Sequence, residues 1–177
     1  MPVKVELTPP DISDYEAGNT GIPYYTTFDS GEPGLHILIN AVTHGNELCG
    51  AITVDFLFRH NVRSTRGRLS LGFANHMAYQ NFNPAAPTAS RYIDEDFNRL
   101  WSPDVLNGPR DSVELRRARE LRPFIETVDF LLDLHSMQQA CPALILSGPL
   151  AKGRALASGV GYPAHVVSDV GHAAGKR

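Results

Sequence analysis

Short apolar runs that alternate with amphipathic segments are the feature of this sequence that most restricts its fold. The runs with β-forming composition cover residues 22–30, 35–42, 68–74, 128–135, 142–146 and 164–167. Helical patterns lie between several of them, at residues 46–60, 111–126 and 150–158. Strands that alternate with helices predict an α/β fold with a mixed, largely parallel sheet and helices on both faces.

Three local expectations follow from the same pattern. The runs 22–30 and 35–42 flank Gly31-Glu32-Pro33-Gly34, which predicts two strands around a turn. Residues 46–60 are expected to form a helix that is buried over much of its surface, and residues 128–135 a buried strand. Cys49 and Cys141 lack the spacing of a disulfide framework or a zinc knot, so both are expected to be buried free cysteines.

Composition limits the functional classes that need to be considered. With 177 residues, 42% hydrophobic and 20% charged, the chain can bury one substantial core, which predicts a single domain over residues 1–177. A net charge of -3 and a pI near 6.1 give no general attraction to nucleic acid or anionic membrane, so neither is an expected partner. The first 21 residues have no apolar run typical of a signal peptide, and we expect a cytoplasmic location. Assembly into a homo-oligomer is left open.

A histidine and a glutamate follow the run 35–42, in the segment His44-Gly45-Asn46-Glu47. Where a strand turns into a helix, this spacing places both side chains on one side of the first helical turn, at two corners of a zinc tetrahedron. His135 closes the run 128–135 and would face the same crevice if the two strands are parallel and close together. Two histidines and one glutamate leave a position open for water. Taken alone, the pair also fits a glutamate that favours the helix dipole, with a histidine near the cap.

Residues 75–104 are polar, rich in Asn and Pro, and longer than an ordinary connector, which indicates a functional loop. The loop contains the segment RYIDEDFNR, residues 91–99. The planar fork of Arg99 binds a carboxylate through two parallel hydrogen bonds, and Asn98 adds an amide donor, so the pair suits a substrate carboxylate. Arg91 could face a carbonyl oxygen that becomes negative when water attacks. The alternative is a solvated loop with internal Asp–Arg pairs.

The motifs HGNE, RYIDEDFNR and DLHS, in this order, resemble the aspartoacylase and succinylglutamate desuccinylase family of the zinc carboxypeptidase superfamily. The resemblance covers residues 34–136. It implies a zinc carboxypeptidase-like fold in which His44, Glu47 and His135 bind zinc.

The same resemblance implies roles for the residues of the loop. Arg91 would polarise the scissile carbonyl, and Asn98 and Arg99 would hold the substrate carboxylate. Asp96, two residues before the asparagine, would orient a zinc histidine and so fix its tautomer and ring direction.

Asp133 and the remaining histidines are the other polar residues to consider. Asp133 lies two residues before His135 and would point to the same face of the strand, where it would contact that ligand or satisfy a neighbouring backbone group. The other histidines have no partner spacing and are expected to be structural or solvated: His36, His60, His76, His165 and His172.

The sequence departs from the family at the general base. Members use a glutamate downstream of the DLH strand and continue into a smaller β-rich C-terminal domain, whereas this sequence has no glutamate after Glu126. Asp94 and Glu95 lie in the carboxylate-binding loop, and that position argues against either as the base without deciding the matter. We therefore expect a catalytic domain that is truncated at its C-terminus, lacks the final core strand or strands and the C-terminal domain, and has no assigned base.

These observations predict a zinc-dependent hydrolase that cleaves the amide bond of an N-acyl amino acid, a small-molecule substrate. Two alternatives stay open, a zinc carboxypeptidase that acts on peptides and a module that binds metal and carboxylate without turnover. The acylase is favoured over the peptidase because the whole RYIDEDFNR segment resembles the acylase branch, while the peptidases share mainly Asp-x-Asn-Arg.

Overall fold

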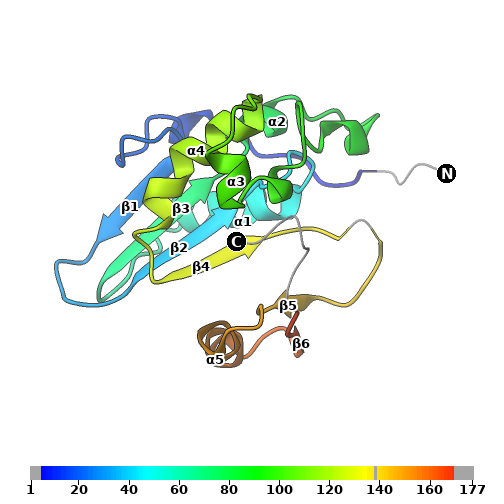
Figure 1. The fold of residues 1–177 in the computed structure, drawn as a ribbon. Helices are drawn as coiled ribbons and strands as arrows, with labels where there is room; N and C mark the ends of the chain where they lie inside the picture. Colours follow the sequence, from blue (N-terminus) through cyan, green and yellow to red (C-terminus); the bar gives the residue numbers. More distant parts are fainter. Residues whose placement is uncertain (1–4, 138, 170–177) are drawn as a thin grey trace.

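The computed structural model describes residues 5–137 and 139–169, and its main feature is a four-stranded mixed sheet (Figure 1). The strand order is β1–β3–β2–β4. The strands are β1 (Tyr25–Asp29), β2 (His36–Ala41), β3 (Arg68–Phe73) and β4 (Phe130–Leu134). β2 runs parallel to both of its neighbours, β3 and β4, and β1 is antiparallel to β3. The predicted mixed, largely parallel sheet is confirmed.

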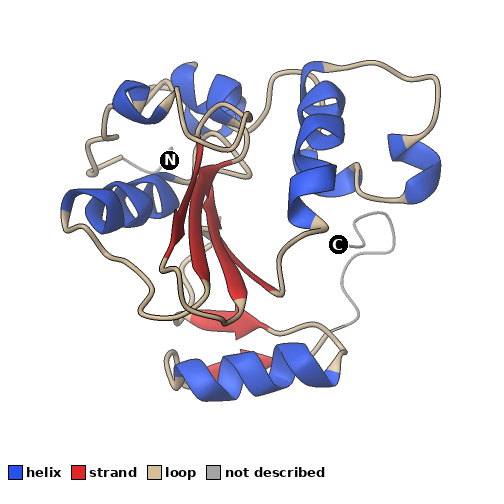
Figure 2. Cartoon of the chain, turned by 90° about the vertical axis from the view of Figure 1, so that its left-hand side faces the viewer, coloured by secondary structure: helices blue, strands red, loops and turns tan. Residues whose placement is uncertain are grey.

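Helices cover both faces of this sheet, which Figure 2 shows edge-on between them. The α-helices are α1 (Leu48–Arg59), α2 (His76–Gln80), α3 (Pro103–Leu106), α4 (Val113–Ile125) and α5 (Ala151–Val160). Single turns of 3-10 helix are η1 (Ser13–Tyr15), η2 (Pro87–Ser90) and η3 (Phe97–Arg99). None of the helices in the described part of the chain is long and apolar enough to cross a membrane.

The expected pairing of the first two strands is wrong. β3 lies between β1 and β2, and it is antiparallel to the first and parallel to the second. The connection between β1 and β2 therefore spans the width of a strand instead of closing a hairpin. A sequence pattern records where strands begin and end, but it does not record a later strand that inserts between two earlier ones.

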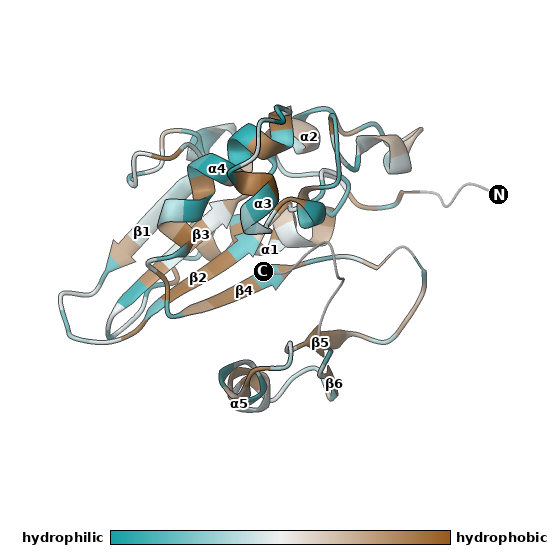
Figure 3. Ribbon diagram, in the orientation of Figure 1, coloured by the Kyte–Doolittle hydropathy of each residue, from teal (hydrophilic) through white to brown (hydrophobic). Residues whose placement is uncertain are grey.

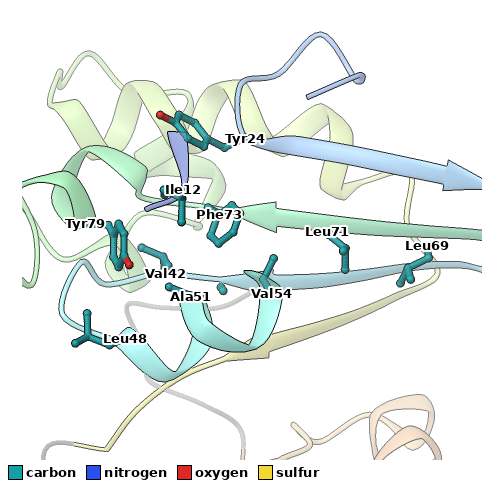
Figure 4. Close-up of a cluster of buried hydrophobic side chains, with 11 residues drawn as sticks. Ile12, Tyr24, Val42, Leu48, Ala51, Val54, Leu69, Leu71, Phe73 and Tyr79 are labelled. Atoms are coloured by element: carbon teal, nitrogen blue, oxygen red, sulfur yellow. The ribbon is translucent and has the colours of Figure 1, made fainter. Parts of the chain in front are cut away.

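Two hydrophobic clusters lie on opposite faces of the sheet. Figure 4 shows the first, in which Ala51 and Val54 of α1 pack against Leu71 and Phe73 of β3. The second joins Leu38 of β2 to residues of α3, η3 and α4. Each face is thus closed by a different part of the chain, and the carboxyl end of β2 lies between the two clusters.

Some burial predictions need correction. β4 is half-buried along its length because it is an edge strand of the main sheet, although its composition is strongly apolar (Figure 3). α1 buries one side, and its Phe56 is 53% exposed. Cys49 and Cys141 are both exposed, not buried: Cys49 is in the first turn of α1, with its Sγ 2.9 Å from Oγ of Ser136, and Cys141 is in the connection after β4.

The chain after β4 forms a smaller unit below the main sheet in Figure 1. It consists of β5 (Leu144–Leu146), α5 and β6 (His165–Val167), and its two strands are parallel. These elements lie where the sequence predicts them. Their strands form a separate two-stranded sheet and do not extend the main one. His172 lies outside the described residues.

Candidate metal centre and active site

The turn after β2 carries the first two candidate ligands and has an unusual backbone. Val42, a buried β-branched residue, has a φ of 60°, in the left-handed region that such residues rarely occupy. A Cβ at Gly45 would lie 2.4 Å from backbone atoms of Ala78 and Ser90, so only glycine fits there. Glu47 is the residue that precedes α1, so the ligand pair lies in this turn and not in the first turn of the helix as predicted.

Three candidate ligands converge although they come from distant parts of the chain. The ligand atoms of His44, Glu47 and His135 all lie within 4.8 Å of one another. The Nδ1 atom of His44 lies 2.9 Å from Oε1 of Glu47, and Nδ1 of His135 lies 3.1 Å from the same oxygen. His44 and Glu47 are buried, and His135 is open to solvent. The parallel pairing of β2 with β4 produces this arrangement because it brings the two strand ends side by side.

The donor set fits a metal ion. The Oε2 atom of Glu47 is buried and has no hydrogen-bond partner among the described residues; it lies 3.0 Å from Nδ1 of His135 but without hydrogen-bond geometry. Burial raises the pKa of Glu47, but hydrogen bonds from His135 and His44 outweigh that effect and hold the pKa at about 2. A buried carboxylate that stays ionised between two imidazoles can take a divalent cation.

Asp96 and Arg91 contact the other nitrogen of His44. Its Nε2 lies 3.2 Å from Oδ1 of Asp96 and 2.8 Å from Nη2 of Arg91, which also donates to Oδ2 of Asp96 at 3.1 Å. Burial raises the pKa of Asp96, but hydrogen bonds from His44 and from the backbone N–H of Asn98 hold it at about 2. If Nδ1 binds metal, the imidazole proton must be on Nε2, where Asp96 accepts it; Arg91 can then no longer donate to Nε2 and keeps its hydrogen bond to Asp96.

Asp133 makes the equivalent contact with the other histidine. Its Oδ2 lies 2.6 Å from Nε2 of His135, and its Oδ1 accepts a hydrogen bond of 2.8 Å from Nδ2 of Asn40. Thr43 also donates its hydroxyl to both carboxylate oxygens. Asn40 and Thr43 had no predicted role. The sequence feature that could have identified Asn40 is its polar side chain within the apolar run 35–42. In the structure Asn40 pairs with Asp133 of β4.

The predicted carboxylate clamp, Asn98 and Arg99, lies in the turn that begins at Asp96, the residue that contacts Nε2 of His44. Asn98 and Arg99 form part of η3 directly after Asp96, and both are half-buried. A small cavity of about 90 Å³, open to solvent, lies beside Glu47. The residues that line it in the described part of the chain are Asn46, Glu47, Arg91, Ser136 and Met137. Arg91 is therefore in this cavity, and the role of Asn98 and Arg99 stays a prediction.

The two loop carboxylates considered as a general base are held elsewhere. Oδ2 of Asp94 accepts the backbone N–H of Val113 at 2.8 Å, and Oε1 of Glu95 accepts the hydroxyl of Ser112 at 2.6 Å. The second oxygen of Glu95 also pairs with Arg110 at 3.1 Å. Both side chains thus bind the start of α4 and neither lines the cavity beside Glu47.

Comparison with known proteins identifies the family. A model of the succinylglutamate desuccinylase/aspartoacylase catalytic domain matches residues 33–174. The chain belongs to this family. An N-acyl-aromatic-L-amino acid amidohydrolase (carboxylate-forming) of Rattus norvegicus is 34% identical over 128 residues, which are 67% of this chain and 38% of the relative. A "probable aspartoacylase" of Parasynechococcus marenigrum is 36% identical over 132 residues, 70% of this chain and 41% of the relative.

A solved structure extends the family assignment to the fold. An aspartoacylase family protein from Mesorhizobium loti superposes with a TM-score of 0.59 and 25% identity, over 79% of this chain and 44% of that one. This desuccinylase/aspartoacylase family chain thus spans about two fifths of the length of the curated relatives named above.

Proposed function

We propose that His44, Glu47 and His135 bind one zinc ion and that this protein hydrolyses the amide bond of an N-acyl amino acid. The observation that carries the metal proposal is the shared orientation of the two imidazoles. Each presents Nδ1 to the Glu47 carboxylate, and each has an aspartate oxygen next to its Nε2. In zinc sites each histidine ligand commonly binds the metal through one ring nitrogen and donates the N–H of the other to a carboxylate.

Zinc is the ion that this donor set favours, because two imidazoles and one carboxylate are the protein ligands of several zinc hydrolases, with one position left for water or substrate. An ion in this position would lower the pKa of a bound water and polarise a carbonyl group. Arg91 lines the cavity beside Glu47, and its side chain is 21% exposed. Its N–H groups would donate to the carbonyl oxygen and stabilise the negative charge that develops on it.

The substrate class rests on the family and on the residues of the loop. The rat relative is named as an N-acyl-aromatic-L-amino acid amidohydrolase, and that of Parasynechococcus marenigrum as a "probable aspartoacylase". We assign Arg99 and Asn98, one turn after Asp96, to the substrate carboxylate, which a guanidinium and an amide can hold together.

A second candidate, metal and carboxylate binding without turnover, is favoured by one observation. Asp94 and Glu95 are held by the start of α4, and no glutamate follows Glu126 in the sequence. These 177 residues then offer no carboxylate that we would assign as the proton acceptor.

Metal analysis tests the proposed site. The chain should bind one zinc ion, and His44→Ala should weaken zinc binding by more than the roughly 10- to 100-fold that an outer contact costs. His60→Ala is the matched control, because His60 is the exposed residue that ends α1 and takes no part in the cluster. Circular dichroism confirms folding of each variant. Equal zinc affinity for His44→Ala and wild type would contradict the proposal.

A hydrolysis assay on the zinc-loaded chain tests the substrate class. N-acetylaspartate, N-succinylglutamate and N-acetyltyrosine are compared with a blocked dipeptide that has a free C-terminal carboxylate. Faster cleavage of the acyl amino acids supports the amidohydrolase, and faster cleavage of the dipeptide supports the carboxypeptidase. Binding of these compounds without cleavage supports the second candidate.

A further inference from the structure

Glu114, the second residue of α4, is fully buried and lies outside the set of residues to which we have assigned a role. Its carboxylate accepts three successive backbone N–H groups of the loop, from Ile93 at 2.6 Å, Asp94 at 3.0 Å and Glu95 at 3.3 Å. Nδ2 of Asn75 donates to it as well, at 3.2 Å. All four partners are donors, so each contact uses an oxygen lone pair of the carboxylate.

The contact is reciprocal. While Glu114 accepts from the loop backbone, side chains of the loop accept from the start of α4: Asp94 from the N–H of Val113 and Glu95 from the hydroxyl of Ser112. The first N–H groups of a helix have no partner within the helix, and Asp94 satisfies one of them. We call this set of hydrogen bonds between residues 93–95 and residues 112–114 the loop clasp.

The loop clasp lies between two residues of the candidate site. Arg91 precedes it and Asp96 follows it, and both contact Nε2 of His44. The loop is anchored a second time at Arg91, whose backbone carbonyl accepts the N–H of Gly45 at 3.0 Å. The backbone between the two anchors has little freedom, so the positions of both side chains depend on both anchors.

We propose that Glu114 is a positioning residue, which sets the loop so that Asp96 meets His44 and Arg91 faces the cavity. The inference rests on the proposed zinc site and extends it to a residue that touches neither metal nor substrate. A surface loop would ordinarily exchange its backbone hydrogen bonds with water, and a buried carboxylate that collects three of them fixes its shape. Replacement by glutamine turns one of the two oxygens into an NH2 donor, so the N–H groups that face that position lose their acceptor.

Zinc affinity in a double-mutant cycle tests whether Glu114 acts through Asp96. The variants are Glu114→Gln, Asp96→Asn and the two combined, with Glu126→Gln as the control because Glu126 is exposed and follows the far end of the same helix. Asp96→Asn should lower zinc affinity by roughly 10- to 100-fold, the usual effect of losing an outer contact, and Glu114→Gln by about 10-fold. The combined variant should be no weaker than Asp96→Asn alone. Losses that multiply, or wild-type affinity in a folded Glu114→Gln variant, would overturn the inference.

Amide hydrogen exchange provides a readout that does not depend on metal. The N–H groups of residues 93–95 should be protected in the wild-type chain and should exchange at least about 10-fold faster in Glu114→Gln. Equal protection in the two proteins would overturn the inference. A wild-type chain that binds no zinc would refute the proposed function. The hydrogen-exchange rates of residues 93–95 would then be the sole test of whether Glu114 sets the shape of the loop.

If Glu114→Gln does not fold, Asp94→Ala opens the loop clasp from its other side at an exposed position. It should weaken zinc binding in the same direction, by a factor of roughly 3 to 10, the lower end of what outer contacts contribute. Unchanged zinc affinity and unchanged exchange in Asp94→Ala would overturn the inference.

Discussion

Oδ2 of Asp133 lies 2.6 Å from Nε2 of His135, at the point where β4 ends. The same carboxylate holds Asn40 of β2 and the hydroxyl of Thr43. One side chain therefore joins the two parallel strands and fixes the ring of His135, the most exposed of the three candidate ligands. Asp133 thus contacts three side chains outside the backbone of its own strand.

Asp133→Asn should lower zinc affinity by roughly 10- to 100-fold, because an amide cannot accept from Asn40, Thr43 and His135 as a carboxylate does. Competition with a chromophoric chelator measures the change. Asp104→Asn, an exposed position in α3, is the control and should bind zinc like the wild type. Equal affinity in Asp133→Asn would show that His135 needs no outer partner.

Gly45→Ala should destabilise the chain by about 1–3 kcal/mol or more, the usual cost of forcing an extra carbon into a packed site. The added Cβ would lie 2.4 Å from the backbone of Ala78 and Ser90, which cannot move aside as a side-chain end can. Urea denaturation measures the loss. Gly159→Ala in α5 meets open space and should be neutral or slightly stabilising. A Gly45→Ala variant of wild-type stability would mean that the turn is looser than described.

Stability should fall as the pH drops from about 6.5 toward 4 because of His76. Burial of the ring, together with the Arg117 guanidinium, lowers the pKa of His76 to about 4. Over this window the unfolded state, with an ordinary histidine pKa near 6.5, binds a proton that the folded state does not, so acidification favours unfolding.

His76→Phe keeps an aromatic ring against Tyr24, whose ring centroid lies 4.3 Å from that of His76. The variant should lose less stability than the wild type between about pH 6.5 and 4. Urea midpoints at pH 7.5, 5.5 and 4.5 give the comparison, with His60→Phe as the exposed control. A His76→Phe profile as steep as that of the wild type would assign the effect to other groups.

Turnover by the 177-residue chain should be slower than that of the full-length relatives by a factor of roughly 10² to 10⁴, the usual contribution of a positioned proton acceptor. The physical reason is that Glu47 is assigned to the proposed metal and that Asp94 and Glu95 bind the start of α4. Initial rates on N-acetylaspartate at equal zinc occupancy test this, with the relative from Parasynechococcus marenigrum as reference. If the rates match, a base exists within these residues, and Glu95→Gln is the first variant to examine.

Local patterns were sufficient to predict most elements and the proximity of the first two candidate ligands. His44 and Glu47 are three residues apart after an apolar run, and no distant contact is needed to bring them together. The position of His135 depends on β4 pairing with β2, which spacing alone does not encode. The order of three family motifs supplied that information.

The errors share a physical cause, which is that pairing and burial are tertiary properties. The exposure of Cys49 and the insertion of β3 between β1 and β2 depend on the tertiary contacts of these segments and not on the neighbouring residues in sequence. Glu114 shows the limit most clearly. A glutamate near a helix start suggests an ordinary dipole contact, and only the fold shows that it is buried against a loop 20 residues earlier.

The separation of the β5–α5–β6 unit from the main sheet has a consequence for spectroscopy. Ala157 is the only fully buried residue between Leu144 and Val167, so little apolar packing ties this unit together, and it should open at a low free energy while the main sheet stays folded. The single tryptophan, Trp101, is far from it in sequence and packs against Phe97 beside the second core cluster. Intrinsic fluorescence will therefore follow the melting of the main body and the loop that ends in η3. Far-ultraviolet circular dichroism will also record the loss of α5, so the two signals should diverge at the start of unfolding.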